Sequence, residues 1–252
     1  MSGHSKWSSI KHKKGALDAK RGKLFTKLIR EITVAAREGG GDPDSNPRLR
    51  LAVQKAKDAN MPSDNIDRGI KKGTGDLEGV TYENISFEGY AVGGVAVIVD
   101  VLTDNRNRAT SSVRAAFAKR GGNMAGAGSV AFQFDRKGVF RVKKGDMTEE
   151  DILEIILDAG AEDMRIDEDG MCEVFCGVQD FDKVRTALKD KGLEIESGEL
   201  SMVPKNTVKV DDVGLARKVL ALMDDLEDND DVQNVYSNFD IPDDVISQIG
   251  NE

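Results

Sequence analysis

Apolar residues recur at every third or fourth position through the first part of the chain, and this spacing predicts helices that face a core. The first apolar stripe consists of Leu17, Leu24, Phe25, Leu28, Ile29, Ile32, Ala35 and Ala36, and it ends at three consecutive glycines. Shorter stripes predict a second helix from Pro47, capped by Ser45 or Asn46, and a third from Ser63 or Asp64 to Gly73. Residues 1–14 have no apolar period, so we expect a polar arm in front of a three-helix unit.

Alternation of apolar and polar residues replaces the helical spacing after residue 80 and predicts strands. The expected strands of this region are Ile85–Phe87, Gly94–Leu102 and Val130–Phe134. A helix from Thr103 or Asp104 to about Arg120 comes before the third of them. The segment Gly121–Gly128 has four glycines in eight residues and predicts a loop.

Residues 138–203 have the order β-α-β-β-α-β, which is typical of the ferredoxin-like unit. Residues 207–239 then add a strand, a helix and a strand. Because region 80–134 has only one helix to cover its sheet, we expect this tail to complete it. The predicted fold class is α+β and multidomain, with a helical domain and two α/β sandwich domains. The expected domains are a basic arm with three helices (1–75), a discontinuous α/β domain (80–134 with 206–240) and an inserted ferredoxin-like domain (135–205).

Charge is divided unevenly along the 252 residues, although the net charge is only −9. Residues 1–75 hold 17 Lys and Arg against 8 Asp and Glu, whereas residues 146–252 hold 9 against 30. A basic end on an acidic chain predicts a nucleic-acid partner that is bound in one orientation, because the acidic end repels phosphate.

Several classes of protein are excluded or disfavoured by composition. The longest strictly apolar run is Val95–Val99, whereas a membrane-spanning helix needs about 20 apolar residues. No apolar stretch follows the basic N-terminus, which argues against a secretory signal. Two cysteines, Cys172 and Cys176, cannot form a disulfide framework, so we expect free thiols and a cytoplasmic location.

Catalytic constellations are sparse in the sequence. Both histidines, His4 and His12, lie in the arm, where nothing positions them for a triad. There is no Walker motif, and the cysteines alternate with Val174 on a strand, which favours buried small hydrophobes over metal ligation. The acidic stretch Asp224–Asp231 lacks EF-hand spacing and favours a solvated charged turn. We therefore expect no enzyme activity, no cofactor, no metal and no small-molecule substrate.

The glycine-rich segment Gly121–Gly128 follows a predicted helix C-terminus, which is the wrong end for a phosphate cradle. It favours a flexible connection; the alternative is a backbone that approaches RNA or a partner closely.

The first 30 residues hold nine Lys and Arg and one acid, Asp18. Lys20, Lys23, Lys27 and Arg30 lie opposite the apolar stripe of the first helix, and Trp7 lies within the basic arm. A bland solvated helix face would mix charges, so this face predicts phosphate contacts, and Trp7 suits base stacking unless it folds back over the helices. The predicted nucleic-acid-binding residues of this region are His4, Lys6, Trp7, Lys11, His12, Lys13, Lys14, Lys20, Arg21, Lys23, Lys27 and Arg30.

Arg106 and Arg108 fall in the first turn of a predicted helix, where the helix dipole disfavours cations by roughly 0.3–1 kcal/mol each. Either phosphate contacts or structural salt bridges would explain them, and the two interpretations stay open. Arg114 lies two turns on and extends the same candidate surface.

Long motifs resemble the YebC family. They include His4-Ser5-Lys6-Trp7, Asp18-Ala19-Lys20-Arg21-Gly22-Lys23, Thr103-Asp104-Asn105-Arg106-Asn107-Arg108 and Val232-Gln233-Asn234-Val235-Tyr236, and the match runs from about residue 2 to 240. The resemblance implies a helical domain followed by two α/β domains, one inserted in the other. The family is usually described as DNA-binding transcriptional regulators, and its mitochondrial members are translational activators of cytochrome c oxidase subunit I.

These observations lead to three hypotheses for the function of the chain. The first is a DNA-binding transcriptional regulator, although no compact helix-turn-helix with base-reading Asn or Gln is evident. The second is an RNA-binding translation factor that docks on the ribosome through residues 1–75, which suits an irregular basic arm. The third, a metal-dependent nuclease, is disfavoured because no carboxylate pair is flanked by a lysine in one motif.

Overall fold

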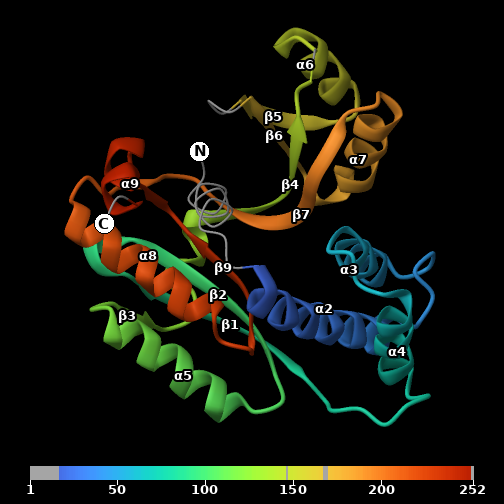
Figure 1. The fold of residues 1–252 in the computed structure, drawn as a ribbon, viewed down its shortest axis with the longest axis horizontal. Coiled ribbons are helices and arrows are strands. Elements are labelled where there is room, and N and C mark those ends of the chain that lie inside the picture. Colours follow the sequence, from blue (N-terminus) through green and yellow to red (C-terminus); the bar gives the residue numbers. More distant parts are fainter. Residues whose placement is uncertain (1–16, 146, 167–169, 251–252) are drawn as a thin grey trace. The chain divides into compact units, whose positions relative to one another are not determined.

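The computed structural model describes residues 17–145, 147–166 and 170–250, with side chains from residue 22 to 249 (Figure 1). These residues form two compact units. One unit is the segment Gln133–Asn206, and the other contains the helical region, residues up to Phe132 and the segment from Thr207.

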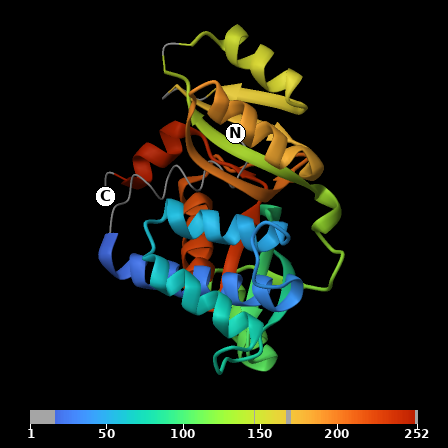
Figure 2. The ribbon, with the colours of Figure 1, turned by 90° about the vertical axis from the view of Figure 1, so that its right-hand side faces the viewer.

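The helical region packs three helices around one small core (Figure 2). They are α2 (Leu17–Gly39), α3 (Pro47–Asp58) and α4 (Ser63–Thr74). Of the two predicted caps for α3, Asn46 is the one used, and its side chain accepts from the Leu49 N–H. Gly73 lies against the α2 backbone, where an added Cβ would stand 2.4 Å from the Thr33 carbonyl oxygen. The predicted caps of α4 are wrong: its N-cap is Pro62, and it ends at Gly75 in the left-handed conformation.

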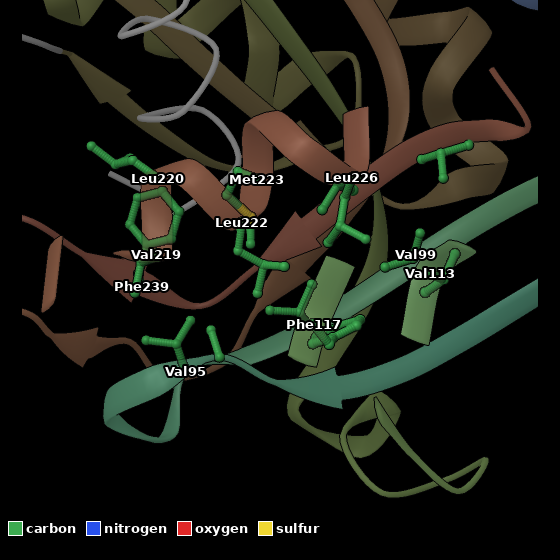
Figure 3. Packing of buried hydrophobic residues seen from close by; sticks show 14 of the residues in the cluster. Val95, Val99, Val113, Phe117, Val219, Leu220, Leu222, Met223, Leu226 and Phe239 are labelled. Atoms are coloured by element: carbon green, nitrogen blue, oxygen red, sulfur yellow. The ribbon is translucent and has the colours of Figure 1, made fainter. Parts of the chain in front are cut away.

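A four-stranded antiparallel sheet forms the centre of the second part of this unit, in the order β3-β1-β2-β9. The strands are β1 (Glu83–Tyr90), β2 (Ala96–Thr103), β3 (Asn123–Ala125) and β9 (Val232–Ser237). Helices α5 (Arg106–Lys119) and α8 (Val213–Glu227) supply buried side chains to one core with the sheet. Figure 3 shows Phe117 of α5 and Leu222 of α8 in this core with Val95 and Val99. The tail thus completes the core of the first α/β segment, as its helix and strand predict.

The predicted third strand at Val130–Phe134 is wrong. Residues Ala131–Gln133 form a short 3-10 helix, Phe132 is 67% exposed, and the strand of this sheet is β3, inside the segment expected to be a loop. The backbone N–H groups of Val130 and Ala131 donate to the Glu88 carboxylate, at 2.6 and 2.8 Å, rather than to a neighbouring strand. Strand β3 pairs with β1 instead, at Gly89, where a Cβ would stand 2.6 Å from the Asn123 carbonyl oxygen. The alternation of Val130, Phe132 and Phe134 carries no information about the pairing of β3 with β1, which requires a glycine at position 89.

The tail carries the predicted first strand and two short elements beyond the prediction. The predicted strand is β8 (Val208–Lys209), which forms a separate parallel pair with β10 (Phe239–Asp240), and α9 (Asp243–Gly250) packs on the α8 core through Val245. Strand β10 has two residues, which are too few to give an alternating pattern.

The other unit has the ferredoxin-like topology, with strand order β5-β6-β4-β7. Its elements are β4 (Phe134–Lys143), α6 (Glu149–Asp158), β5 (Ala161–Ile166), β6 (Met171–Cys176), η3 (Val178–Asp180), α7 (Phe181–Asp190) and β7 (Glu194–Pro204). Thr148 and Asp151 form a capping box at the start of α6, and Phe140 of β4 stacks on Phe181 of α7 at 4.6 Å. Cys172 and Cys176 are fully buried, and burial raises the pKa of the Cys176 thiol to about 11. Both cysteines therefore behave as the predicted core residues.

The fold is α+β, with an N-terminal helical region, a discontinuous α/β part and an inserted ferredoxin-like unit. Among the described helices, none has the length and apolar character that crossing a membrane requires.

Candidate nucleic-acid interface

Nine of the predicted binding residues have no described side chain. His4, Lys6, Trp7, Lys11, His12, Lys13 and Lys14 lie outside the described residues, and Lys20 and Arg21 belong to α2 by their backbone only. Their predicted role stays a prediction. The described candidates are Lys23, Lys27, Arg30, Arg106, Arg108 and Arg114.

Three cations of α2 form a row that contacts the C-terminal end of α8. We call Lys23, Lys27 and Arg30 the cation row, and residues 224–231 the acidic turn. Lys27 Nζ donates to the Glu227 carbonyl at 2.7 Å, and Lys23 Nζ donates to the Asp228 carbonyl at 3.1 Å. The row therefore satisfies carbonyl oxygens that the last turn of a helix leaves without intrahelical partners.

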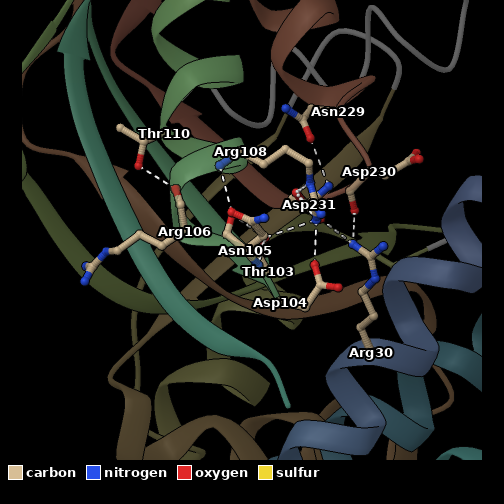
Figure 4. Close-up of polar contacts among 10 residues, drawn as sticks. All are labelled: Arg30, Thr103, Asp104, Asn105, Arg106, Arg108, Thr110, Asn229, Asp230 and Asp231. Atoms are coloured by element: carbon tan, nitrogen blue, oxygen red, sulfur yellow. Dashed lines mark hydrogen bonds and ion pairs between the residues drawn. The ribbon is translucent and has the colours of Figure 1, made fainter. Parts of the chain in front are cut away.

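Asp231 joins the end of this row to a second arginine (Figure 4). Arg30 Nη1 donates to the Asp230 carbonyl at 2.5 Å and to Asp231 Oδ1 at 3.1 Å. Arg108 Nη2 contacts the same carboxylate at 2.9 and 3.1 Å, and its Nε at 3.2 Å. The Asp231 side chain is only 7% exposed, so two arginines compensate one buried carboxylate.

Charge at the end of α8 explains why the chain brings these cations together. The last turn of α8 contains no basic residue, and acidic groups there oppose the helix dipole. Cations come from other elements instead: the cation row from α2, and Lys119 and Arg120 from the end of α5 and its cap. Arg120 contacts Asp225 at 2.7 and 3.1 Å and lowers the pKa of that carboxyl.

Arg108 therefore makes the structural ion pairs that one of its two interpretations predicts, and a phosphate contact of this residue stays a prediction. It also donates to Asp104 Oδ1 at 2.6 Å, and this bond lowers the pKa of Asp104. The helix cap is Asn105, next to the predicted Thr103 and Asp104, and its side chain accepts from the Arg108 N–H at 3.0 Å. These ion pairs offset the cost of a cation in the first turn of α5.

Arg106 and Arg114 behave differently from Arg108. The Arg106 side chain is 63% exposed and only approaches Glu83, at 3.9 Å. Arg114 is exposed and has no hydrogen-bond or ion-pair partner among the described residues. These two side chains remain accessible to a ligand.

The prediction of a solvated turn at Asp224–Asp231 is wrong for part of that stretch. Asp231 is buried, and the carbonyls of three neighbours accept from the cation row. The sequence pattern did not indicate Asp231 as a partner of these cations, nor Tyr82, whose ring centroid lies 5.6 Å from the Arg30 guanidinium carbon. The sequence shows a basic segment in α2 and an acidic segment about 200 residues later. Opposite charge suggests that the two segments attract, but it does not specify which residues form contacts.

Exposed cations without such partners lie elsewhere on the helical region. Arg37, Lys57, Arg68 and Lys71 are exposed, and their side chains have no hydrogen-bond or ion-pair partner among the described residues. Lys57 and Lys71 line one hollow between α3 and α4, above the apolar side chains of Val53, Ile66 and Ile70. Asp67 also lines this hollow, and the four cationic side chains make no hydrogen bond or ion pair that a ligand would have to displace.

Among the residues that the structure describes, no three His, Cys, Asp or Glu side chains are grouped so that they could hold a metal ion.

The fold and the cation-rich helical region define a class: α+β proteins with a basic helical part and a ferredoxin-like insertion. Residues 5–76 match the family profile described as the TACO1/YebC protein N-terminal domain, and residues 82–239 match the TACO1/YebC second and third domain. The chain belongs to the TACO1/YebC family.

Relatives and a solved structure agree with this membership. A protein of Syntrophobacter fumaroxidans is 57% identical over 249 residues, covering 99% of this chain and 100% of its own length. One of Rubrobacter xylanophilus is 58% identical over 250 residues, covering 99% of each. Both are named "Probable transcriptional regulatory protein". The crystal structure of a conserved hypothetical protein of Aquifex aeolicus is similar with a TM-score of 0.82 and 48% identity, covering 90% of this chain and 93% of that one.

Proposed function

We propose that the chain is a non-enzymatic, nucleic-acid-binding regulator of gene expression, and that its basic N-terminal region makes the contact. The observation that carries this proposal is the charge of residues 1–75, 17 Lys and Arg against 8 Asp and Glu, in a chain of net charge −9. The names of the relatives, probable transcriptional regulatory proteins, support regulation of gene expression.

Within this function we expect structured RNA of the ribosome to be the preferred target over a DNA operator. An arm with one tryptophan can stack on an unpaired base, which duplex DNA rarely offers. The acidic residues of 146–252 would be repelled by a long duplex but can point away from a ribosomal surface.

A competition assay tests the proposal with the full chain at about 150 mM salt, close to physiological ionic strength. The competitors are purified ribosomes, promoter DNA and DNA of scrambled sequence. We expect ribosomes to compete best, and a Trp7→Ala variant to lose about 1–3 kcal/mol of RNA affinity through lost stacking. A promoter preference of about a thousandfold over scrambled DNA, without ribosome binding, would instead support transcription.

A matched pair of variants locates the contact. Replacing Lys11, Lys13 and Lys14 by Gln should weaken binding and flatten the salt dependence, whose slope on duplex DNA is about −4 to −5 if roughly five phosphates are neutralised. The control replaces Lys183, Lys189 and Lys191, exposed residues on and just after α7, by Gln. Equal losses in the two triple variants would contradict an N-terminal interface.

A further inference from the structure

We propose that the cation row is a phosphate-binding site that the chain's own acidic turn occupies in the structure described here, and that nucleic acid displaces the turn. This inference rests on the proposed function and concerns its regulation. In this proposal the acidic turn at the end of α8 and the nucleic acid compete for the same cations of α2.

The ligands of the cation row resemble a phosphate backbone. Each of the three cations meets an oxygen of the acidic turn: two lysines contact backbone carbonyls at 2.7 and 3.1 Å, and Arg30 contacts a carbonyl and a carboxylate. Successive cations stand four and three residues apart, so they rise along α2 in steps of about 6 and 4.5 Å and point to one side. Such a row can follow a series of acceptor oxygens, whether the carbonyls and carboxylate of a protein turn or the phosphates of a nucleic acid.

The contact is polar, which makes it exchangeable. The core of the helical region and the core of the α/β part are separate clusters that share no residue. The outer end of the contact is exposed, since the side chains of Lys23 and Asp228 are 47% and 67% accessible and stand 3.6 Å apart. Exposed pairs of this kind contribute little stability and weaken with salt, so a polyanion can replace them.

One donor of the row is unused when the turn is bound. Arg30 Nε is buried and has no hydrogen-bond partner. A guanidinium that binds phosphate commonly donates from two nitrogens in parallel, which the acidic turn does not achieve with Arg30. The exchange therefore gives Arg30 a partner that the closed contact lacks.

Asp231 contributes to both states of the protein: the closed state, in which the acidic turn contacts the cation row, and the open state, in which nucleic acid has displaced the turn. Arg108 keeps its contacts with Asp231 when Arg30 leaves, so the carboxylate retains one of its two arginine partners. Asp231 therefore stabilises the closed state through Arg30, and in the open state its buried carboxylate is still paired with Arg108.

The first test measures binding of a labelled RNA hairpin and a labelled DNA duplex to the full chain at about 150 mM salt. Asp231→Asn weakens the closed contact and should bind at least about fivefold more tightly, the lower end of typical coupling between linked equilibria. The control Asp244→Asn makes the same charge change at an exposed residue of α9. A Lys27→Gln variant should bind more weakly than the wild type, since the site itself is damaged. If Asp231→Asn does not fold, as judged by its thermal melt, Asp228→Asn at the exposed end of the contact takes its place with the same expected direction.

The second test measures the opening itself. Spin labels on Asp64→Cys in α4 and Lys218→Cys in α8 report the distance between the two parts, because the buried native cysteines do not react. Saturating RNA, and separately high salt, should lengthen this distance.

The outcomes separate the two proposals. If no protein binds either probe, the proposed function fails. If the wild type binds but Asp231→Asn binds no better than Asp244→Asn, or the label distance stays unchanged at saturation, the function stands and the displacement mechanism is overturned.

Discussion

Glu88 is a buried carboxylate whose role is to hold a loop in place. Its side chain accepts from the backbone N–H groups of Gly128 at 2.6 Å, Val130 at 2.6 Å and Ala131 at 2.8 Å. Burial alone would raise the pKa of Glu88, but these three donors outweigh it and lower the pKa. The glycine-rich segment is therefore fixed at its end by one side chain, which disfavours the interpretation of a flexible connection.

Replacing Glu88 by Gln should lower the free energy of unfolding by about 1–3 kcal/mol, because an amide accepts with one oxygen and turns its NH₂ group toward another donor. The sign of the pH effect follows from the lowered pKa. The stabilisation by Glu88 is present above the ordinary glutamate value of 4.5 and is lost as the pH falls through the folded value. Chemical denaturation of wild type and variant across acidic pH measures both effects, and a constant difference between them would contradict this role.

At the scale of elements, Asn46 joins the end of α2 to the start of α3. Its Oδ1 accepts from the Leu49 N–H at 3.0 Å, while its Nδ2 donates to the carbonyls of Ala35 and Gly40, each at 2.8 Å. One buried amide therefore caps two helices, and only a side chain with both a donor and an acceptor can do so.

Two substitutions separate these functions of Asn46. Asn46→Ala removes all three bonds and should cost about 2 kcal/mol or more in thermal or chemical unfolding. Asn46→Asp keeps the cap but places a carboxylate against two carbonyl oxygens, so it should also destabilise at neutral pH and recover as the carboxyl protonates. An Asp variant as stable as the wild type at neutral pH would show that the donors do not matter.

Elements whose signals are local could be predicted from the sequence. The helix at Pro47 follows from Asn46 and an apolar stripe, and the buried strand β2 follows from a run of β-branched residues beside glycines. Strand β3 could not be predicted, because its three residues pair with β1 only through the close approach at Gly89. The basic face of α2 could be predicted from periodicity, whereas its contact with Asp231 depends on the tertiary fold.

At the scale of the whole molecule, the ferredoxin-like unit closes on itself. Its first and last strands are neighbours, with Phe134 opposite Pro204, and the Lys205 N–H donates to the Gln133 carbonyl at 2.8 Å. The chain thus enters and leaves this unit at one place, and we therefore expect each part to fold without the other.

Residues 133–206 expressed alone should unfold cooperatively, and a chain in which a short Gly-Ser linker joins Phe132 to Thr207 should keep the remaining fold. Circular dichroism and calorimetry of both proteins test this. Residues 80–132 alone should fail to fold, because α8 and β9 of their core lie beyond the insertion. A stable 80–132 fragment would contradict the shared core.

The pairing of β2 with β9 has a consequence for synthesis on the ribosome. Val97 pairs with Ser237, so the sheet cannot be completed until nearly the whole chain has been synthesised. The inserted unit ends at Asn206 and has been synthesised in full before that point. During that interval the nascent chain presents an unpaired strand edge and the valines that α8 later covers, a combination that invites association with other chains. Messages truncated before residue 232 should therefore yield products that chaperones retain and proteases remove, even though one of their domains is fully folded.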